Sequence, residues 1–336
     1  MRVIAVEEHC VTPELRELLG PQIHPYYPAN RWPAELERRM ADIGDGRIAE
    51  MDAAGISMQV LSTAQPGLEH TPGEQAVAVA RAFNDGIAEA MRRHPSRFSG
   101  FAALPTADPG ASAAELERAV TELGLCGAMV NGRTRERFLD DQFFWPIFES
   151  AEALGVPLYL HPMPPPRGVY DTYYAGFGDD VGFAFAAGAW GWHVETGLHA
   201  VRLMLAGVFD RFPRLQLILG HMGELLPLML ERTSGVISGT PTLGATGTSM
   251  ELSVAEYTRR NVFISISGFF SDPPLRLALD TIGADRILFA VDHPFGNDLE
   301  ARRFLDAAAI TDEQREKIAH ANAERLLGLA PAGSAD

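Results

Sequence analysis

The sequence predicts an α/β protein with the architecture of a (β/α)8 TIM barrel, and three observations lead to this fold class. Short apolar runs alternate with helix-like segments along the chain. Eight such runs can be counted. Acidic residues or histidines follow several of them, among them His161, His221 and Asp292. Polar residues at the carboxyl ends of successive strands are typical of a barrel with a site on its upper face.

The expected strands and helices follow one another in a regular order. We expect strands at residues 3–6, 58–62, 98–104, 128–130, 158–160, 215–219, 262–266 and 287–290. We expect helices at residues 42–54, 74–93, 112–123, 141–154, 195–209, 224–232, 298–308 and 311–327. Two stretches fit neither pattern: a proline-rich one at 21–33, which we expect to act as a lid, and a long aromatic loop after His161.

Length and composition favour one soluble domain. We expect a single barrel over residues 1–329 and a disordered tail over 330–336, because no linker-like composition divides the chain. No apolar stretch is long enough to span a bilayer, and the first residues show no signal-peptide pattern. The presence of only two cysteines, Cys10 and Cys126, then favours a cytoplasmic location. A formal charge of −16 argues against nucleic acid as a partner.

The polar residues at the strand ends are candidate metal ligands. Glu7 and His9 are two apart on the first expected strand, so both point to one face while Glu8 points to the other. His161 or His221 alone would fit a hydrogen-bonded core histidine equally well, but their recurrence with Asp292 at equivalent positions favours ligands. Imidazole and carboxylate ligands suit Zn, Mn or Fe, and the chain lacks the thiolate cluster that would demand Zn.

Several short motifs give the chain a resemblance to a known family. They are Glu7-Glu8-His9, Leu104-Pro105, Asn131-Gly132, His161-Pro162, Arg202-Leu203-Met204, the run from Leu219 to Glu224, the run from Ala284 to Phe289, and Asp292-His293-Pro294-Phe295. In order and spacing they resemble the amidohydrolase superfamily, over residues 3 to 328. More narrowly, they resemble its metal-dependent decarboxylases, such as aminocarboxymuconate-semialdehyde, γ-resorcylate and 2,3-dihydroxybenzoate decarboxylases.

The resemblance implies one divalent metal ion, Mn²⁺ first and Zn²⁺ as the alternative. Its ligands would be Glu7, His9, His161 and Asp292. A carboxylate in place of the superfamily's more usual first histidine adds negative charge, which favours a hard ion such as Mn²⁺. His221 would lie close to the metal and the substrate.

Other residue roles also follow from the resemblance alone. Glu224, one helical turn after His221, would orient its ring, and Arg232, further along that helix, would brace this pair or the substrate. An ordinary helix-end cation is the other interpretation of Arg232. Arg47 matches a position that reaches into a neighbouring subunit's site, or it is a solvated helix residue. Asn131 would hydrogen-bond a substrate oxygen, or it serves the turn before Gly132.

The implied reaction is the non-oxidative decarboxylation of a small aromatic acid with a hydroxyl group beside its carboxylate. Asp292 would protonate the ring carbon, and Trp192, His293 and Phe295 would contact the ring. Relatives of this kind lead us to expect a homodimer or homotetramer. Two alternatives remain open: hydrolysis of an amide, lactone or carbon–carbon bond by a metal-bound water, and a metal-binding protein without catalysis. The sequence does not indicate which acid is used.

Overall fold

Parallel strands form the centre of the molecule. The computed structural model describes residues 1–19, 32–240 and 250–330. Its strands are β1 (Ile4–Cys10), β2 (Met58–Thr63), β3 (Phe98–Gly100), β4 (Ala102–Ala103), β5 (Ala128–Asn131), β6 (Leu158–His161), β7 (Leu217–Leu219), β8 (Val262–Ser265) and β9 (Ile287–Leu288). Neighbouring strands pair in chain order, as β1-β2-β3 and as β4-β5-β6-β7-β8-β9, and every pair is parallel.

Main-chain hydrogen bonds close these strands into a barrel. The expected strand at 98–104 is present as two pieces, β3 and β4, joined at Phe101, whose N–H donates to Leu61 O at 2.8 Å. At the other edge Val6 N donates to Phe289 O at 3.1 Å, and His9 N donates to His293 O at 2.7 Å. With β3 and β4 counted as one strand, the nine segments form eight strands. The predicted (β/α)8 barrel is therefore confirmed.

The direction of the side chains on β1 depends on an irregularity that sequence alternation does not reveal. Inside the barrel Ile4 and Val6 pack with residues of the other strands, including Tyr159 of β6. Strict alternation would then turn Glu8 inward. Instead the pairing of β1 with β2 shifts between Ala5 and Glu8, where β1 has one residue more than its partner. This bulge-like shift turns Glu7 and the residue two positions later into the barrel.

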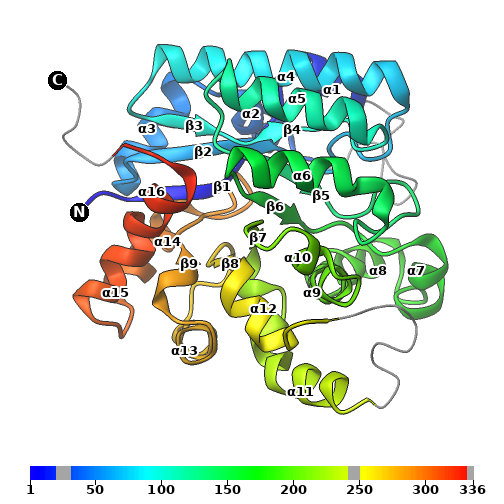
Figure 1. Ribbon diagram of the computed structural model, residues 1–336. Coiled ribbons are helices and arrows are strands. Elements are labelled where there is room, and N and C mark those ends of the chain that lie inside the picture. Colours follow the sequence, from blue (N-terminus) through cyan, green and yellow to red (C-terminus); the bar gives the residue numbers. More distant parts are fainter. Residues whose placement is uncertain (20–31, 241–249, 331–336) are drawn as a thin grey trace.

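Helices cover the outside of the barrel, with α4 and α5 along one side and α7, α8 and α9 gathered at another (Figure 1). They are α1 (Pro13–Leu19), α2 (Ala34–Ala41), α3 (Asp45–Ala54), α4 (Gly73–Arg93), α5 (Pro109–Thr121), α6 (Trp145–Leu154), α7 (Arg167–Tyr173), α8 (Asp179–Ala186), α9 (Gly191–Leu205), α10 (Val208–Arg211), α11 (Leu226–Ser238), α12 (Val254–Asn261), α13 (Asp272–Thr281), α14 (Asp298–Ala307), α15 (Asp312–Glu316) and α16 (Asn322–Leu327). Short turns of helix lie at η1 (Gln142–Phe144), η2 (His221–Gly223), η3 (Ala284–Arg286) and η4 (Lys317–Ala321).

Four local expectations need correction or fall outside the described residues. The aromatic segment after β6 is not a plain loop, because it contains α7 and α8. The sequence pattern also did not predict α12 or α13, although Ser253 and Glu256 form a capping box at the start of α12. Most of the expected lid at 21–33 lies outside the described residues, and α1 and α2 flank it. The expected disordered tail, apart from Ala330, lies outside them too.

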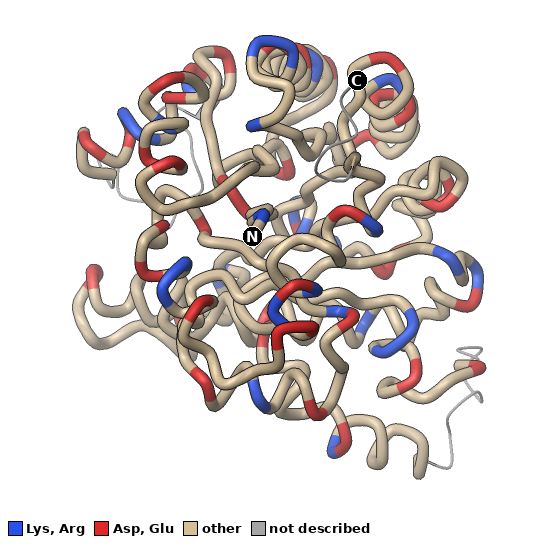
Figure 2. Tube along the Cα trace, turned by 90° about the vertical axis from the view of Figure 1, so that its left-hand side faces the viewer, with Lys and Arg blue, Asp and Glu red and all other residues tan. Residues whose placement is uncertain are grey.

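The described surface carries mixed charge. None of the described helices combines the length and the apolar character needed to cross a membrane. In the view of Figure 2, Lys and Arg positions lie among Asp and Glu positions. The formal charge of the chain is −16.

Candidate metal centre

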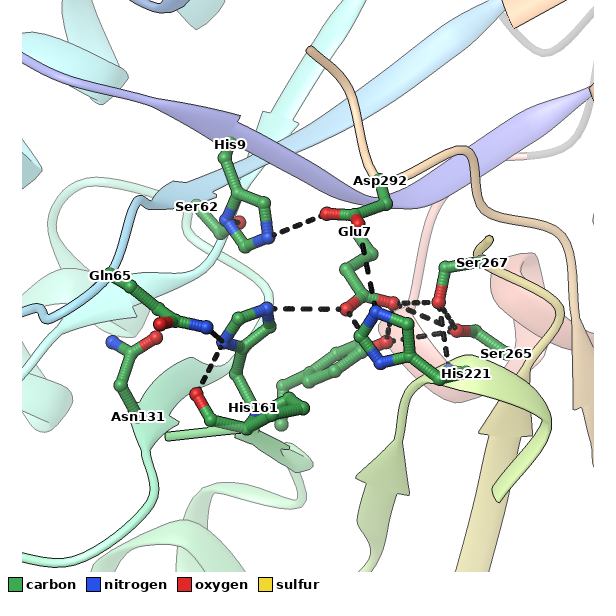
Figure 3. Close-up of polar contacts among 12 residues, drawn as sticks. Glu7, His9, Ser62, Gln65, Asn131, His161, His221, Ser265, Ser267 and Asp292 are labelled. Carbon is green, nitrogen blue, oxygen red and sulfur yellow. Dashed lines mark hydrogen bonds and ion pairs between the residues drawn. The ribbon is translucent and has the colours of Figure 1, made fainter. Parts of the chain in front are cut away.

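Four of the predicted residues meet at the carboxyl ends of the strands. Glu7 and His9 come from β1, His161 ends β6, and Asp292 lies just after β9. One ligand atom from each side chain lies within 4.8 Å of the others. His9 Nε2 lies 3.2 Å from Asp292 Oδ1, and His161 Nε2 lies 3.5 Å from Glu7 Oε1 (Figure 3). The structure thus brings together all four side chains that we predicted as metal ligands.

Two buried atoms of this group lack a partner among the described residues. Glu7 Oε1 and His9 Nε2 are buried and make no hydrogen bond there. The other ring nitrogens of the histidines lie against main-chain carbonyls, with His9 Nδ1 at 2.8 Å from Thr63 O and His161 Nδ1 at 3.1 Å from Pro162 O. An Nδ1–H that donates to a carbonyl leaves the Nε2 lone pair free to coordinate. The donor set therefore fits one divalent ion.

The Glu7 carboxylate is held in place by three hydroxyl groups. Its Oε2 accepts hydrogen bonds from Tyr159 on β6, from Ser265 on β8 and from Ser267 just beyond it (Figure 3). Gly220 leaves the space that this carboxylate occupies, because a Cβ at that position would lie 2.8 Å from Glu7 Oε1. The sequence reading missed these hydroxyl groups. Tyr159 precedes His161 by two residues, so strand alternation already placed it on the ligand face.

His221 is oriented by a carboxylate that also holds a second histidine. Glu224 Oε1 lies 2.7 Å from His221 Nδ1, and Glu224 Oε2 lies 2.6 Å from His193 Nδ1. The expected link between His221 and Glu224 is present, but the local geometry differs from the expected helical turn. Residues 221, 222, 224 and 225 all have positive φ, and α11 begins only at Leu226. His193, on α9, was not singled out from the sequence, since it sits in a helix rather than at a strand end.

The protonation states differ across the site. Burial, followed by the positive charge of neighbouring histidines, holds the pKa of His161 well below its usual value, so this ring is neutral. Burial would also lower the pKa of His221, but the carboxylates of Glu7 and Glu224 outweigh it and raise that pKa well above its usual value. Burial would raise the pKa of Asp292, yet the interactions with His221 and His9 outweigh it and bring that pKa below its usual value. A cationic His221 therefore faces an anionic Asp292, with Nε2 3.6 Å from Oδ2.

A cavity of about 350 Å³ opens over these groups. Its lining is mostly aromatic and includes two residues predicted to contact substrate, Trp192 and Phe295. The other lining residues are Trp32, Gln65, His161, Phe183, Gly188, His193, His221, Gly268, Phe269 and Asp292. Within the described part of the chain, therefore, no lysine or arginine lines the cavity. A flat ring of benzoate size suits a pocket of this volume and lining.

Comparison with known proteins places the chain in a family. A family model described as amidohydrolase matches residues 21–329. The chain belongs to the amidohydrolase family. Its γ-resorcylate decarboxylase relative from Polaromonas sp. (strain JS666) is 38% identical, over 97% of this chain and 98% of the relative. The predicted resemblance to amidohydrolases and their decarboxylase branch is confirmed.

Solved amidohydrolase structures extend the similarity to three dimensions. The 5-carboxyvanillate decarboxylase from Sphingomonas paucimobilis has a TM-score of 0.90 at 32% identity, covering 98% of this chain and 99% of its own. A dihydroxybenzoic acid decarboxylase from Polaromonas sp. JS666 has a TM-score of 0.85 at 37% identity, with 98% of each chain covered. That second protein was solved with bound manganese and the inhibitor 2-nitroresorcinol.

Two residues that we predicted to contact substrate are held elsewhere in this amidohydrolase. Asn131 does not line the described cavity; its Nδ2 donates to Thr63 Oγ1 at 3.3 Å, and its main-chain N–H donates to Glu69 Oε1 at 2.6 Å. His293 is 1% exposed and turns away from the cavity, with Nδ1 3.0 Å from Asp298 Oδ2. Strand-end position alone therefore did not predict which polar side chains line the described cavity, and the contact of Asn131 and His293 with substrate stays a prediction.

The two arginines also differ from expectation. Arg47 is only 1% exposed, and its Nη2 donates to His9 O at 2.6 Å. The interpretation of Arg47 as a solvated helix residue is therefore wrong, whereas a role for it in a neighbouring subunit's site stays a prediction. Arg232 is exposed on α11, whereas the Glu224 carboxylate contacts His193 and His221. The structure does not bring Arg232 to the cavity of its own chain.

Proposed function

We propose that this amidohydrolase is a metal-dependent, non-oxidative decarboxylase of an aromatic acid with a hydroxyl group beside its carboxylate. The observation that carries this proposal is the convergence of Glu7, His9, His161 and Asp292 beneath an aromatic cavity. Relatives that match nearly the whole chain are named as decarboxylases of hydroxybenzoates, which supports the reaction type. The enzyme would be a carbon–carbon lyase.

We propose Mn²⁺ as the resident ion, with Zn²⁺ as the alternative. Two carboxylates and two imidazoles suit a hard divalent cation, and a relative with 37% identity was solved with manganese. When bound, the ion supplies Lewis-acid stabilisation of the substrate's phenolic oxygen and orients the ring. Glu7, His9, His161 and Asp292 would hold it.

Asp292 would protonate the ring carbon that bears the carboxylate. The bond between that carbon and the carboxylate then breaks, its electron pair restores the aromatic ring, and CO2 leaves. Because the pKa of Asp292 lies below its usual value, the proton must reach it from a neighbour. His221, cationic and 3.6 Å away, is the group best placed to supply it. The aromatic lining would exclude water from the ring during this transfer.

The lining of the cavity favours a substrate with one carboxylate. A second carboxylate buried there would meet no lysine or arginine among the described lining residues, and an uncompensated buried charge is costly. A dihydroxybenzoate such as γ-resorcylate (2,6-dihydroxybenzoate) satisfies this condition. 5-Carboxyvanillate, which carries two carboxylates, does not.

We propose that the chain assembles as a homodimer or homotetramer and works in the cytoplasm. Several large apolar side chains of α7, α8, α9 and the segments between them are exposed, as expected of a surface that a second copy covers. They are Tyr173, Phe177, Val181, Phe185, Trp190, Val194 and Leu198. Cys10 and Cys126 are both free, which suits a reducing compartment. Sedimentation at working concentration tests the assembly.

A substrate panel tests the reaction. Protein loaded with Mn²⁺ is incubated with 2,6-dihydroxybenzoate, 2-hydroxybenzoate, 4-hydroxybenzoate and 5-carboxyvanillate, and with an ester, a lactone and an amide. We expect CO2 release from the acids that carry one carboxylate and an ortho hydroxyl group, little from 4-hydroxybenzoate or from 5-carboxyvanillate with its second carboxylate, and loss of activity with a chelator. Hydrolysis of the second group without decarboxylation of the first would replace the proposal with the hydrolase alternative.

A further inference from the structure

Glu8 stands between two proposed metal ligands on β1 but faces away from them. It is fully buried, and its carboxylate reaches the segment that carries Asp292. Glu8 Oε1 accepts from Val291 N at 2.9 Å, and Glu8 Oε2 accepts from His293 N at 3.3 Å. These two amides belong to the residues on either side of Asp292. One carboxylate therefore holds the main chain both before and after the proposed proton donor.

The Asp292 segment has a conformation that calls for such support. Asp292 has φ 70°, in the left-handed region that residues other than glycine adopt at a cost. Its carbonyl accepts from Gly296 N at 2.7 Å, and His9 N donates to His293 O at 2.7 Å. The two hydrogen bonds to Glu8 add to these main-chain hydrogen bonds, and they come from the side of β1 that faces away from the cavity. The strained backbone is thus fixed by its surroundings rather than by local preference.

Arg47 also holds the main chain beside a proposed ligand, in this case His9 on β1. Its guanidinium is buried and donates from Nη2 to His9 O at 2.6 Å and from Nε to Asp42 O at 2.8 Å. Glu8 and Arg47 both lie outside the barrel interior and outside the described cavity. Neither can act on substrate directly, so any effect on turnover must pass through the residues that they hold.

We propose that Glu8 is a positioning residue for Asp292, fixing through the two flanking amides where its carboxylate lies in the metal centre. The irregularity in β1 makes this arrangement possible, because it turns Glu7 and His9 inward and leaves Glu8 to face Val291 and His293. The proposal rests on the proposed function, in which Asp292 is both ligand and proton donor. In this proposal Glu8, unlike Glu7 and His9 of the same motif, binds neither metal nor substrate and acts by holding Asp292 in position.

The test is metal binding, which does not depend on knowing the substrate. Glu8→Gln keeps the shape of the side chain but offers one oxygen, so one flanking amide meets an NH2 group. We expect the affinity of the metal-free protein for Mn²⁺, titrated in the absence of substrate, to fall about 10- to 100-fold. Glu115→Gln is the matched control, because Glu115 is a buried carboxylate on α5 that binds Asn84 and Arg118, away from the site. It should leave Mn²⁺ affinity unchanged.

A double-mutant cycle separates positioning from a general structural role. If Glu8 acts through Asp292, Glu8→Gln should lower Mn²⁺ affinity in the wild-type background and change it little in an Asp292→Ala background. Equal losses in both backgrounds, or the same loss with Glu115→Gln, would overturn the proposal. If Glu8→Gln does not fold, Glu8→Asp, which withdraws the carboxylate by one methylene, takes its place in the same cycle.

The outcomes also separate this inference from the proposed function. A wild-type chain that binds no Mn²⁺ overturns both. A wild-type chain that binds Mn²⁺ and decarboxylates, but shows an additive cycle, overturns only the role of Glu8. A non-additive cycle in a chain that binds Mn²⁺ but decarboxylates none of the acids would keep Glu8 as a positioning residue and reject the reaction.

Discussion

The residues at the strand ends and the aromatic residues above them are held in different ways. We call the first group the rim (Glu7, His9, His161, His221 and Asp292) and the second group the cover. Most residues of the rim are buried and individually held: Glu7 accepts three hydroxyl hydrogen bonds, and His9 and His161 lie against main-chain carbonyls. The cover consists of α8 and α9 with Phe295, and Phe185 on α8 packs edge-to-face against Tyr174 and Phe177, with Phe177 and Phe185 exposed. We therefore expect the rim to determine the reaction and the cover to determine which ring is accepted.

The largest effect should come from the rim, with Asp292→Asn. An amide has no proton to give to the ring carbon, so we expect kcat to fall about 10²- to 10⁴-fold. The amide oxygen can still coordinate, so elemental analysis should find the metal retained. A near-normal kcat with metal bound would show that Asp292 is not the acid, and His221 would become the first candidate.

A smaller effect should follow from Glu224→Gln, because Glu224 contacts His221 and is not a proposed metal ligand. The variant removes a charge that raises the pKa of His221, so that pKa should fall. The protonated form of His221 is then lost at a lower pH, and the high-pH limb of the kcat profile should move toward acid. We expect kcat at neutral pH to fall about 10- to 100-fold. An unchanged pH profile would exclude His221 as the source of the proton.

The smallest effect should come from the cover, with Trp192→Leu. Loss of one aromatic contact costs about 0.5–1.5 kcal/mol, which corresponds to a rise in KM of about 2- to 10-fold, with kcat little changed. The order of preference within a panel of hydroxybenzoates should change as well. Trp190→Leu, on an exposed neighbour that does not line the described cavity, is the control. If kcat of Trp192→Leu fell as much as kcat of Asp292→Asn, the proposed difference in role between rim and cover would be wrong.

This division also explains what the sequence could and could not predict. Apolar runs are followed by Glu7, His9, His161, His221 and Asp292. Side chains alternate along a strand, and the carboxyl ends of parallel strands lie at one edge of the barrel, so this pattern predicts polar residues gathered at that edge. The fold and the group of candidate ligands therefore followed from local patterns, whereas the choice of Glu7, His9, His161 and Asp292 as the ligand set came from the resemblance to amidohydrolases. Which face of β1 turns inward did not, because a shift of one residue in pairing reverses strict alternation.

The side chains that sequence reasoning misplaced depend on long-range packing. Arg47 and His293 look like polar residues available to a site, yet both are buried by contacts with residues distant in the chain. Arg47 donates to the main chain of His9, and His293 contacts Arg39. His193 was missed for the opposite reason, since a histidine within a helix gives no sign that it will meet Glu224. Such contacts exist only once the barrel has closed.

Isotope incorporation tests the central claim most directly. The Mn²⁺-loaded chain is incubated with 2,6-dihydroxybenzoate in D2O, and the product is examined by mass spectrometry and NMR. The account predicts resorcinol with one deuterium at the carbon that carried the carboxylate, formed far more slowly by Asp292→Asn. Absence of resorcinol from the wild-type chain, together with hydrolysis of ester, lactone or amide substrates by the same protein, would contradict it.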